Sequence, residues 1–219
     1  MPLGEFRRIF DYLRDSETLA QALDDRWRLG QVSAYMIPLF SIMGCFDQAI
    51  AYGQRTLAIA EALSDFPLQV QANYGLGDAY RGLGDYLQAL EILSQTVVSL
   101  AGEHIRECFG MARSLSVFAR GVLSDCLADL GRFAEGIACA EEAVRMAEAI
   151  DHPHSLVRAW ATLGGLYCTK GDFYKAIPVL ERGLDLCQSV EIRTLLPWVT
   201  SRLGCCWNGW SSVLSLGAR

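Results

Sequence analysis

A short motif recurs at nearly constant spacing along this chain of 219 residues. A glycine followed two residues later by an aromatic residue recurs along the chain, and five of these glycines are successively 40, 40, 47 and 40 residues apart. These glycines are Gly4, Gly44, Gly84, Gly131 and Gly171. A fixed period of this length is typical of repeat proteins, in which each unit buries its apolar face against the next unit. The repeat therefore constrains the fold more than any single residue does.

The stretch before each glycine has the periodicity of a helix. In the sequence WATLGGLY, Trp160, Leu163, Gly164 and Tyr167 fall at i, i+3, i+4 and i+7, which is one helical face. Upstream, NYGLGDAY repeats the same face from Asn73 to Tyr80. Each glycine suits the left-handed residue that ends a helix, and the residue after it can begin the next helix. The period thus predicts a series of helical hairpins.

These residues resemble the signature of the tetratricopeptide repeat. The resemblance rests on Trp-x2-Leu-Gly-x2-Tyr, on the Gly-Asp-Phe that follows it at Gly171, and on Ala176-x3-Leu180. It implies an all-α, right-handed superhelical solenoid of antiparallel helix pairs, about ten helices in all. Because the period of 40 exceeds the usual 34, we expect helices that are longer by nearly one turn. The chain also looks like the repeat array of a larger bacterial signalling protein.

The punctuation of the sequence suggests where each repeat begins and ends. The single spacing of 47 adds seven residues, about two helical turns, which we expect to lengthen a helix of the third complete hairpin. We expect a repeat array over residues 1–204, followed by a non-repeat tail over 205–219. Within the array we expect a half repeat at 4–25, repeats at about 28–65, 66–101, 104–151 and 153–189, and a partial repeat at 191–204.

Composition disfavours several classes of partner and location. The net charge is −6 and 20% of the residues are charged, so no basic excess favours nucleic acid or an anionic membrane surface. The sequence contains neither an apolar run of about 18 residues nor an apolar signal segment at its start. The eight cysteines form no CxxC motif and suggest free thiols in a reducing compartment. We therefore expect a cytoplasmic protein.

The candidate chemical groups are sparse. His152 and His154 flank a proline at an expected helix start, and His104 and Cys108 stand four residues apart. Neither pair has the further ligands or the orienting group that a metal site or an activated nucleophile needs. Phosphate-binding and hydrolase motifs are also absent from the sequence. We expect no catalytic residue, no metal and no cofactor, and hence a protein that is not an enzyme.

Surface residues of the first helices are the remaining candidates, because these helices line the concave side of a solenoid. The predicted groove for a partner consists of Gln71, Tyr74, Asp78, Arg81, Phe118, Asp125, Asp129 and Arg158. The alternative for any one of them is a solvated position or a contact between helices. The family's clamp for acidic C-terminal peptides uses lysine, arginine and asparagine, whereas aspartates stand here. The resemblance together with these aspartates favours a basic or amphipathic segment.

Two functions from different classes fit these features. The first is a non-catalytic scaffold that binds a segment of a partner protein in its groove. The second is an intramolecular regulatory or oligomerising arm of a larger signalling protein with a nucleotide-cyclase or NTPase domain. A small-molecule sensor pocket is a weaker third. Apolar helix faces at both ends of the array also suggest self-association into a dimer or larger assembly.

Overall fold

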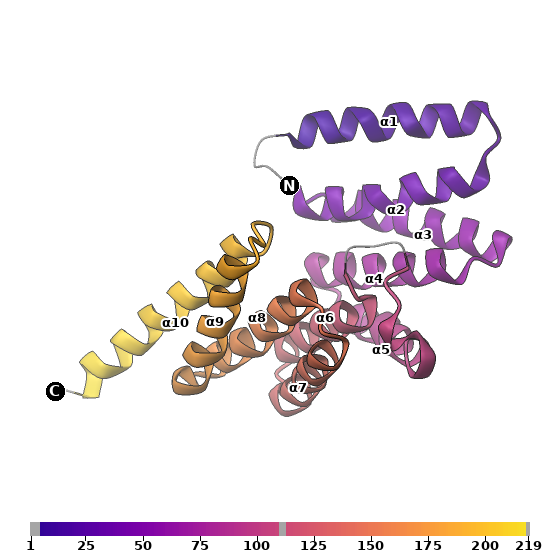
Figure 1. The fold of residues 1–219 in the computed structure, drawn as a ribbon. Coiled ribbons are helices and arrows are strands. Elements are labelled where there is room, and N and C mark those ends of the chain that lie inside the picture. The colour runs from indigo at the N-terminus through magenta and orange to yellow at the C-terminus, as the bar shows by residue number, and fades with distance from the viewer. Residues whose placement is uncertain (1–4, 110–112, 218–219) are drawn as a thin grey trace. The chain divides into compact units, whose positions relative to one another are not determined.

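The computed structural model describes residues 5–109 and 113–217 (Figure 1). These residues form ten α-helices and one short 3-10 helix, and no strand occurs among them, which confirms the all-α prediction. The helices are α1 (Phe6–Ala22), α2 (Arg26–Ile42), α3 (Phe46–Leu63), α4 (Phe66–Leu83), α5 (Tyr86–Ser99), η1 (Gly102–Arg106), α6 (Leu115–Asp129), α7 (Phe133–Ile150), α8 (Pro153–Lys170), α9 (Phe173–Ser189) and α10 (Leu196–Gly217).

Consecutive helices pack as pairs within two compact units, Met1–Val98 (unit 1) and Ser99–Arg219 (unit 2). In unit 1, α1 packs on α2, α2 on α3 and α3 on α4. In unit 2, the same succession runs from α6 to α10. The first helices of successive pairs also contact each other, α2 with α4 in unit 1, and α6 with α8 and α8 with α10 in unit 2. The predicted tetratricopeptide-like arrangement of helix pairs is confirmed.

Left-handed residues end the helices where the repeat glycines were expected to do so. Gly44, Gly84, Gly131 and Gly171 have φ values of 74°, 92°, 77° and 87°, and Gly4 lies outside the described residues. In this region of φ a side chain is strained, which is why glycine recurs there. Ser64 and Asp151 take left-handed conformations at the turns between repeats. Seven of the helices contain 17 or 18 residues, as a 40-residue period requires.

In two of the helix pairs, a glycine of the first helix receives a leucine of the second helix. A Cβ added to Gly77 of α4 would lie 2.5 Å from Leu93 of α5, and one added to Gly164 of α8 would lie 2.5 Å from Leu180 of α9. Both leucines are fully buried. The Leu-Gly pair of the repeat motif is thus explained by close packing of two helices, where any side chain larger than hydrogen would collide.

The seven additional residues do not lengthen a helix, so that prediction was wrong. The segment between α5 and α6 contains η1, and α6 has only 15 residues. Gly102 has a φ of 68°, in the left-handed region, where a regular helix cannot continue. Ser114 then begins α6, because its side chain accepts a hydrogen bond from the backbone nitrogen of Val117. Residues 110–112 of this segment lie outside the described part of the chain.

One helix covers the C-terminal region. Helix α10 continues through Gly204, so the boundary expected between the array and a tail falls inside this helix. Cys206 is fully buried in a core cluster with Val157, Leu180 and Val199. Residues 218–219 of the expected tail lie outside the described residues.

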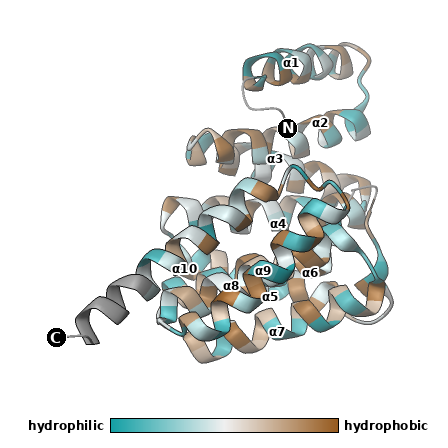
Figure 2. Ribbon diagram, turned by 60° about the vertical axis from the view of Figure 1, so that its left-hand side comes forward, coloured by the Kyte–Doolittle hydropathy of each residue, from teal (hydrophilic) through white to brown (hydrophobic). Residues whose placement is uncertain are grey.

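Polar and apolar residues are mixed along the helices (Figure 2). Within the described residues, we find no helix with the length and apolar character needed to cross a membrane.

Candidate interaction surface

The four predicted groove residues of unit 1 lie on α4. Gln71, Tyr74, Asp78 and Arg81 follow one another at steps of three and four residues, and all are half-buried. This spacing places them along one side of the helix. Each of them takes part in a polar, electrostatic or ring contact. They are therefore built into the local structure as well as partly accessible to solvent.

Three of the four predicted residues of unit 2 belong to a charged and aromatic cluster. We call Phe118 and Asp125 of α6, Arg158 of α8, and Trp198 and Arg202 of α10 the arginine cluster. The Asp125 carboxylate lies 3.6 Å from Nη2 of Arg158 and 3.4 Å from Nη2 of Arg202. Nη1 of Arg202 also donates to the backbone oxygen of Ala161, at 3.3 Å. One carboxylate of α6 is thus bound by arginines of the next two first helices.

Aromatic rings hold the two guanidinium groups. The guanidinium carbon of Arg158 lies 4.2 Å from the centre of the Trp198 ring, and that of Arg202 lies 4.4 Å from it. Arg158 also lies over Phe118, at 5.7 Å. Cation–π contacts of this kind favour a fixed orientation of a guanidinium. The backbone of Gly165 provides the space for Arg202, because a Cβ there would lie 1.4 Å from its Nη1.

Asp125 is consequently not an open carboxylate. The residue is only 6% exposed, and two cations face its oxygens. The sequence suggested carboxylates at the centre of the groove, but in unit 2 the Asp125 carboxylate is buried and paired with two arginines. Asp129, one turn further along α6, is exposed and takes part in a contact of its own.

Sequence reasoning missed Trp198 and Arg202. They belong to the segment that was interpreted as a partial repeat, so its side chains were not considered as part of the surface. The signal that could have found them is their spacing: an aromatic residue and an arginine stand four residues apart on a first helix. The contact from Arg202 to Asp125 joins residues 77 positions apart, a separation that the periodicity does not predict.

Two buried polar atoms beside the cluster lack hydrogen bonds. Nε of Arg158 and Oγ1 of Thr162 are buried without a hydrogen-bond partner in the described part of the chain. Both lie 3.3 Å from the point where a Cβ of Gly121 would be. Buried donors are nearly always paired in native proteins, so the hydrogen-bonding capacity of Arg158 is incompletely used.

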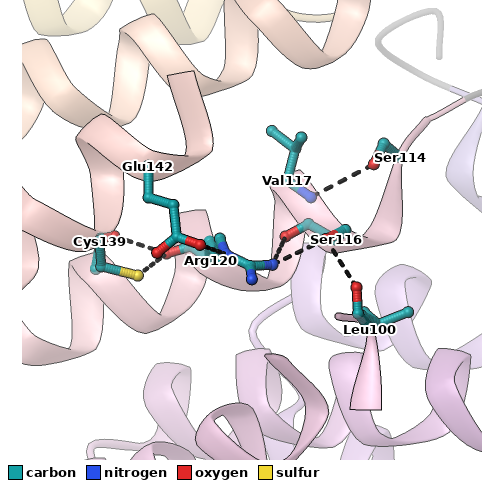
Figure 3. Close-up of polar contacts among 8 residues, drawn as sticks. Leu100, Ser114, Ser116, Val117, Arg120, Cys139 and Glu142 are labelled. Atoms are coloured by element: carbon teal, nitrogen blue, oxygen red, sulfur yellow. Dashed lines mark hydrogen bonds and ion pairs between the residues drawn. The ribbon is translucent and has the colours of Figure 1, made fainter. Parts of the chain in front are cut away.

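A second charged group in unit 2 is buried on a different side of α6. Arg120 is 5% exposed; its Nη1 donates to Oγ and to the backbone oxygen of Ser116, and its Nε contacts the Glu142 carboxylate at 3.3 Å. Ser116 in turn donates to the backbone oxygen of Leu100, at 3.4 Å (Figure 3). This network joins Leu100 to α6 and α7. We interpret it as a structural element, because most of its bonds join side chains to the backbone.

The histidines support the helix-start interpretation. His152 is the N-cap of α8, and its side chain accepts a hydrogen bond from the backbone nitrogen of Ser155. His154 stacks on Phe118 with ring centres 5.6 Å apart, and burial, with neighbouring His152, Arg113 and Arg158, lowers its pKa. Among the described residues, no group of three or more histidine, cysteine, aspartate or glutamate side chains could hold a metal ion.

Comparison of sequences shows the family. Residues 39–97 and 114–189 match the tetratricopeptide repeat family, more than half of the chain, and the chain therefore belongs to that family. Members of this family are generally non-catalytic scaffolds for protein interactions. None of the curated proteins matches the sequence.

Solved structures share the fold at low sequence identity. BtubC (BKLC) from P. vanneervenii is 17% identical with a TM-score of 0.67, over 98% of this chain and 86% of that one. A Rap protein complexed with Competence and Sporulation Factor is 16% identical with a TM-score of 0.73, over 95% of this chain and 60% of that one. A signal transduction ATPase with numerous domains and a tetratricopeptide repeat sensor, from Pyrococcus horikoshii, is 14% identical with a TM-score of 0.66. That alignment covers 91% of this chain and 30% of the ATPase chain.

Proposed function

We propose that this chain is a non-catalytic scaffold that binds a segment of another polypeptide along its first helices. The observation that carries the proposal is the arginine cluster, in which α6, α8 and α10 bring charged and aromatic side chains together on one side of unit 2. Arginine and tryptophan are the residues most enriched at the energetic centres of protein interfaces. The Rap structure supports the proposal, because it is a similar fold described in complex with a factor.

The proposed binding residues are those of α4, α6 and α8 that the sequence suggested. Asp78 and Asp129 support a basic or amphipathic segment at their positions, whereas Asp125 supports it less, because both of its contacts are with arginines. We regard the charge preference of the ligand as a separate question from the existence of the binding surface.

A second candidate is a regulatory arm within a longer protein. The observation that favours it is the ATPase from Pyrococcus horikoshii, in which a tetratricopeptide repeat sensor belongs to a chain much longer than the part aligned here. Self-association through this chain belongs to the same candidate. Light scattering over a wide range of concentration tests it: a monomer throughout would contradict the oligomeric form of this proposal.

Site-specific photo-crosslinking tests the scaffold proposal. A photoreactive amino acid is placed at Thr169, which is exposed on α8 one turn after Gly165. The matched control places it at Glu148, which is exposed on α7, a second helix. We expect a host protein to be cross-linked from position 169 and not from 148, with the cross-linked peptide identified by mass spectrometry. Equal labelling from both positions would contradict binding along the first helices.

A further inference from the structure

Two cysteines of unit 2 meet where α8 packs against α10. Cys168 of α8 packs against the core cluster that contains Cys206 of α10, and the two thiols are in hydrogen-bonding contact. One turn earlier on both helices, Arg202 occupies the space where a side chain at Gly165 would lie. Both contacts join residues about one repeat period apart. The same register of α8 against α10 therefore brings the two sulfur atoms together.

The two thiols differ in their access to solvent. Both are free cysteines, but Cys168 is partly exposed whereas Cys206 is fully buried. Burial and the neighbouring Cys168 raise the pKa of the Cys206 thiol, so this thiol stays protonated and is a poor first target for an oxidant. A small oxidant from solvent therefore reaches Cys168 first, with a second thiol directly behind it.

We propose that Cys168 and Cys206 form a modification site, at which hydrogen peroxide converts the two thiols into a disulfide between α8 and α10. The Cys168 sulfur attacks one peroxide oxygen, and the other oxygen leaves with the thiol proton as water. The Cys206 sulfur then attacks the resulting sulfenic acid and forms the S–S bond, while the sulfenic oxygen leaves with the Cys206 proton as a second water. Two thiols lose two electrons and two protons, and one peroxide is reduced to two waters.

The disulfide has a structural consequence for the last helix. A cross-link restricts the unfolded and partly unfolded states of the chain that it joins. Helix α10 packs on α8 and α9, so a bond from Cys206 to Cys168 holds it in place. In a reducing compartment such a bond is transient and acts as a redox signal. The modification needs no partner polypeptide and is independent of the scaffold function.

Oxidation of the folded chain followed by peptide mapping tests the site. The full chain is treated with a small excess of hydrogen peroxide, the remaining thiols are alkylated in denaturant, and tryptic peptides are identified by mass spectrometry. We expect a disulfide between the peptides 159–170 and 203–219, which contain Cys168 and the Cys205–Cys206 pair. Dithiothreitol should reverse it. Hydrogen exchange of α10 should be slower by about tenfold or more in the oxidised chain than in the reduced chain.

The matched control is the neighbouring Cys205, which is exposed on α10. Cys205→Ser should keep the disulfide with Cys168, whereas Cys206→Ser should abolish it. Should Cys206→Ser fail to fold by circular dichroism, Cys168→Ser provides the test, because it changes the partly exposed member of the pair and should abolish the same disulfide. Cys187, which is buried in the same core cluster, should be recovered as a free thiol.

Three results would overturn the proposal. A disulfide that persists in Cys206→Ser, or is lost in Cys205→Ser, would assign the oxidised pair to Cys205. Oxidation of Cys168 to a sulfinic acid without any disulfide would show that Cys206 does not reach it. None of these results bears on the scaffold function, because the photo-crosslinking from position 169 is carried out on the reduced chain.

Discussion

Unit 1 and unit 2 have the same helix pairs but place their charged side chains differently. In unit 1, the Asp25–Arg28 ion pair lies at a helix start, and the Glu17–Arg55 pair joins partly exposed side chains. In unit 2, Arg120 and Asp125 are buried inside the helix pairs. Burying a charge is costly unless it is paired and hydrogen-bonded. The comparison teaches that the repeat motif specifies the helix packing, whereas the buried charges distinguish one repeat from another.

The largest expected effect is that of Arg120→Ala in unit 2. The change leaves a cavity, removes one partner of Ser116 and leaves Glu142 without its arginine, so we expect the free energy of unfolding to fall by about 3 kcal/mol. Arg55→Ala in unit 1 removes a partly exposed ion pair and should cost at most about 1 kcal/mol. Urea unfolding combined with hydrogen exchange of each unit measures both. If Arg120→Ala and Arg55→Ala lower the free energy of unfolding by the same amount, the buried arginine stabilises the fold no more than the partly exposed one.

The next effect concerns a contact that the two units share. Gly77→Ala and Gly164→Ala should each lower the free energy of unfolding by about 1 to 3 kcal/mol, because the new methyl group collides with a buried leucine. Gly204→Ala is the control: apart from its chain neighbours and the adjacent backbone of its own helix, no described atom lies within 4 Å of the added Cβ, so alanine should stabilise α10 by up to about 1 kcal/mol. Thermal unfolding of the three variants compares them. A stabilising effect of Gly77→Ala would contradict the packing described for this pair.

A smaller effect should separate two helix starts. Asp65 caps α4 by accepting from the backbone nitrogen of Leu68, and it also accepts from Nε1 of Trp27. Asp65→Ala should therefore cost about 1 kcal/mol. Asp172, at the corresponding place before α9, makes no capping hydrogen bond through its side chain, and we expect Asp172→Ala to cost less. Chemical denaturation of both variants measures the two costs. Equal costs would show that the acidic residue before the helix stabilises it without a capping hydrogen bond.

The smallest effect is a difference in pH dependence between the units. Burial lowers the pKa of His154 below 6.5, so the fold favours its neutral form. Its stabilising contribution is complete above pH 6.5 and is lost as the pH falls through that value and the folded-state pKa. All three histidines belong to unit 2, so hydrogen exchange at pH 5 and pH 7 should differ there first. His154→Gln should reduce this difference; an unchanged difference would show that His154 does not cause it.

Local sequence rules predicted most of the helix pairs. The left-handed glycines, the Leu-Gly packing positions and the capping turn at His152 all depend on residues that are close in the chain, and the structure shows each of them. The segment before α6 was predicted wrongly, because a seven-residue insertion preserves helical phase whether or not it is helical. In the structure this segment is not part of a long helix, because Gly102 has a positive φ and Ser114 caps the start of α6.

The surface was less predictable than the helix pairs. Periodicity indicates which side of a helix a residue occupies, and it placed Asp125 and Arg158 on first helices. It does not show which side chains of different repeats meet. The pairing of Asp125 with Arg202 depends on the length of an arginine side chain and on the space above Gly165, neither of which appears as a motif.

The glycine–leucine contact also has a consequence for how the chain folds and diversifies. In both units the two partners are sixteen positions apart, within a single helix pair. Contacts over such short separations form quickly, because little loop entropy is lost before they form. Each pair can therefore nucleate its own folding, and a gene duplication that adds or removes forty residues leaves every such contact intact. The number of repeats can then change by whole steps, while single substitutions at other positions change what a particular repeat recognises.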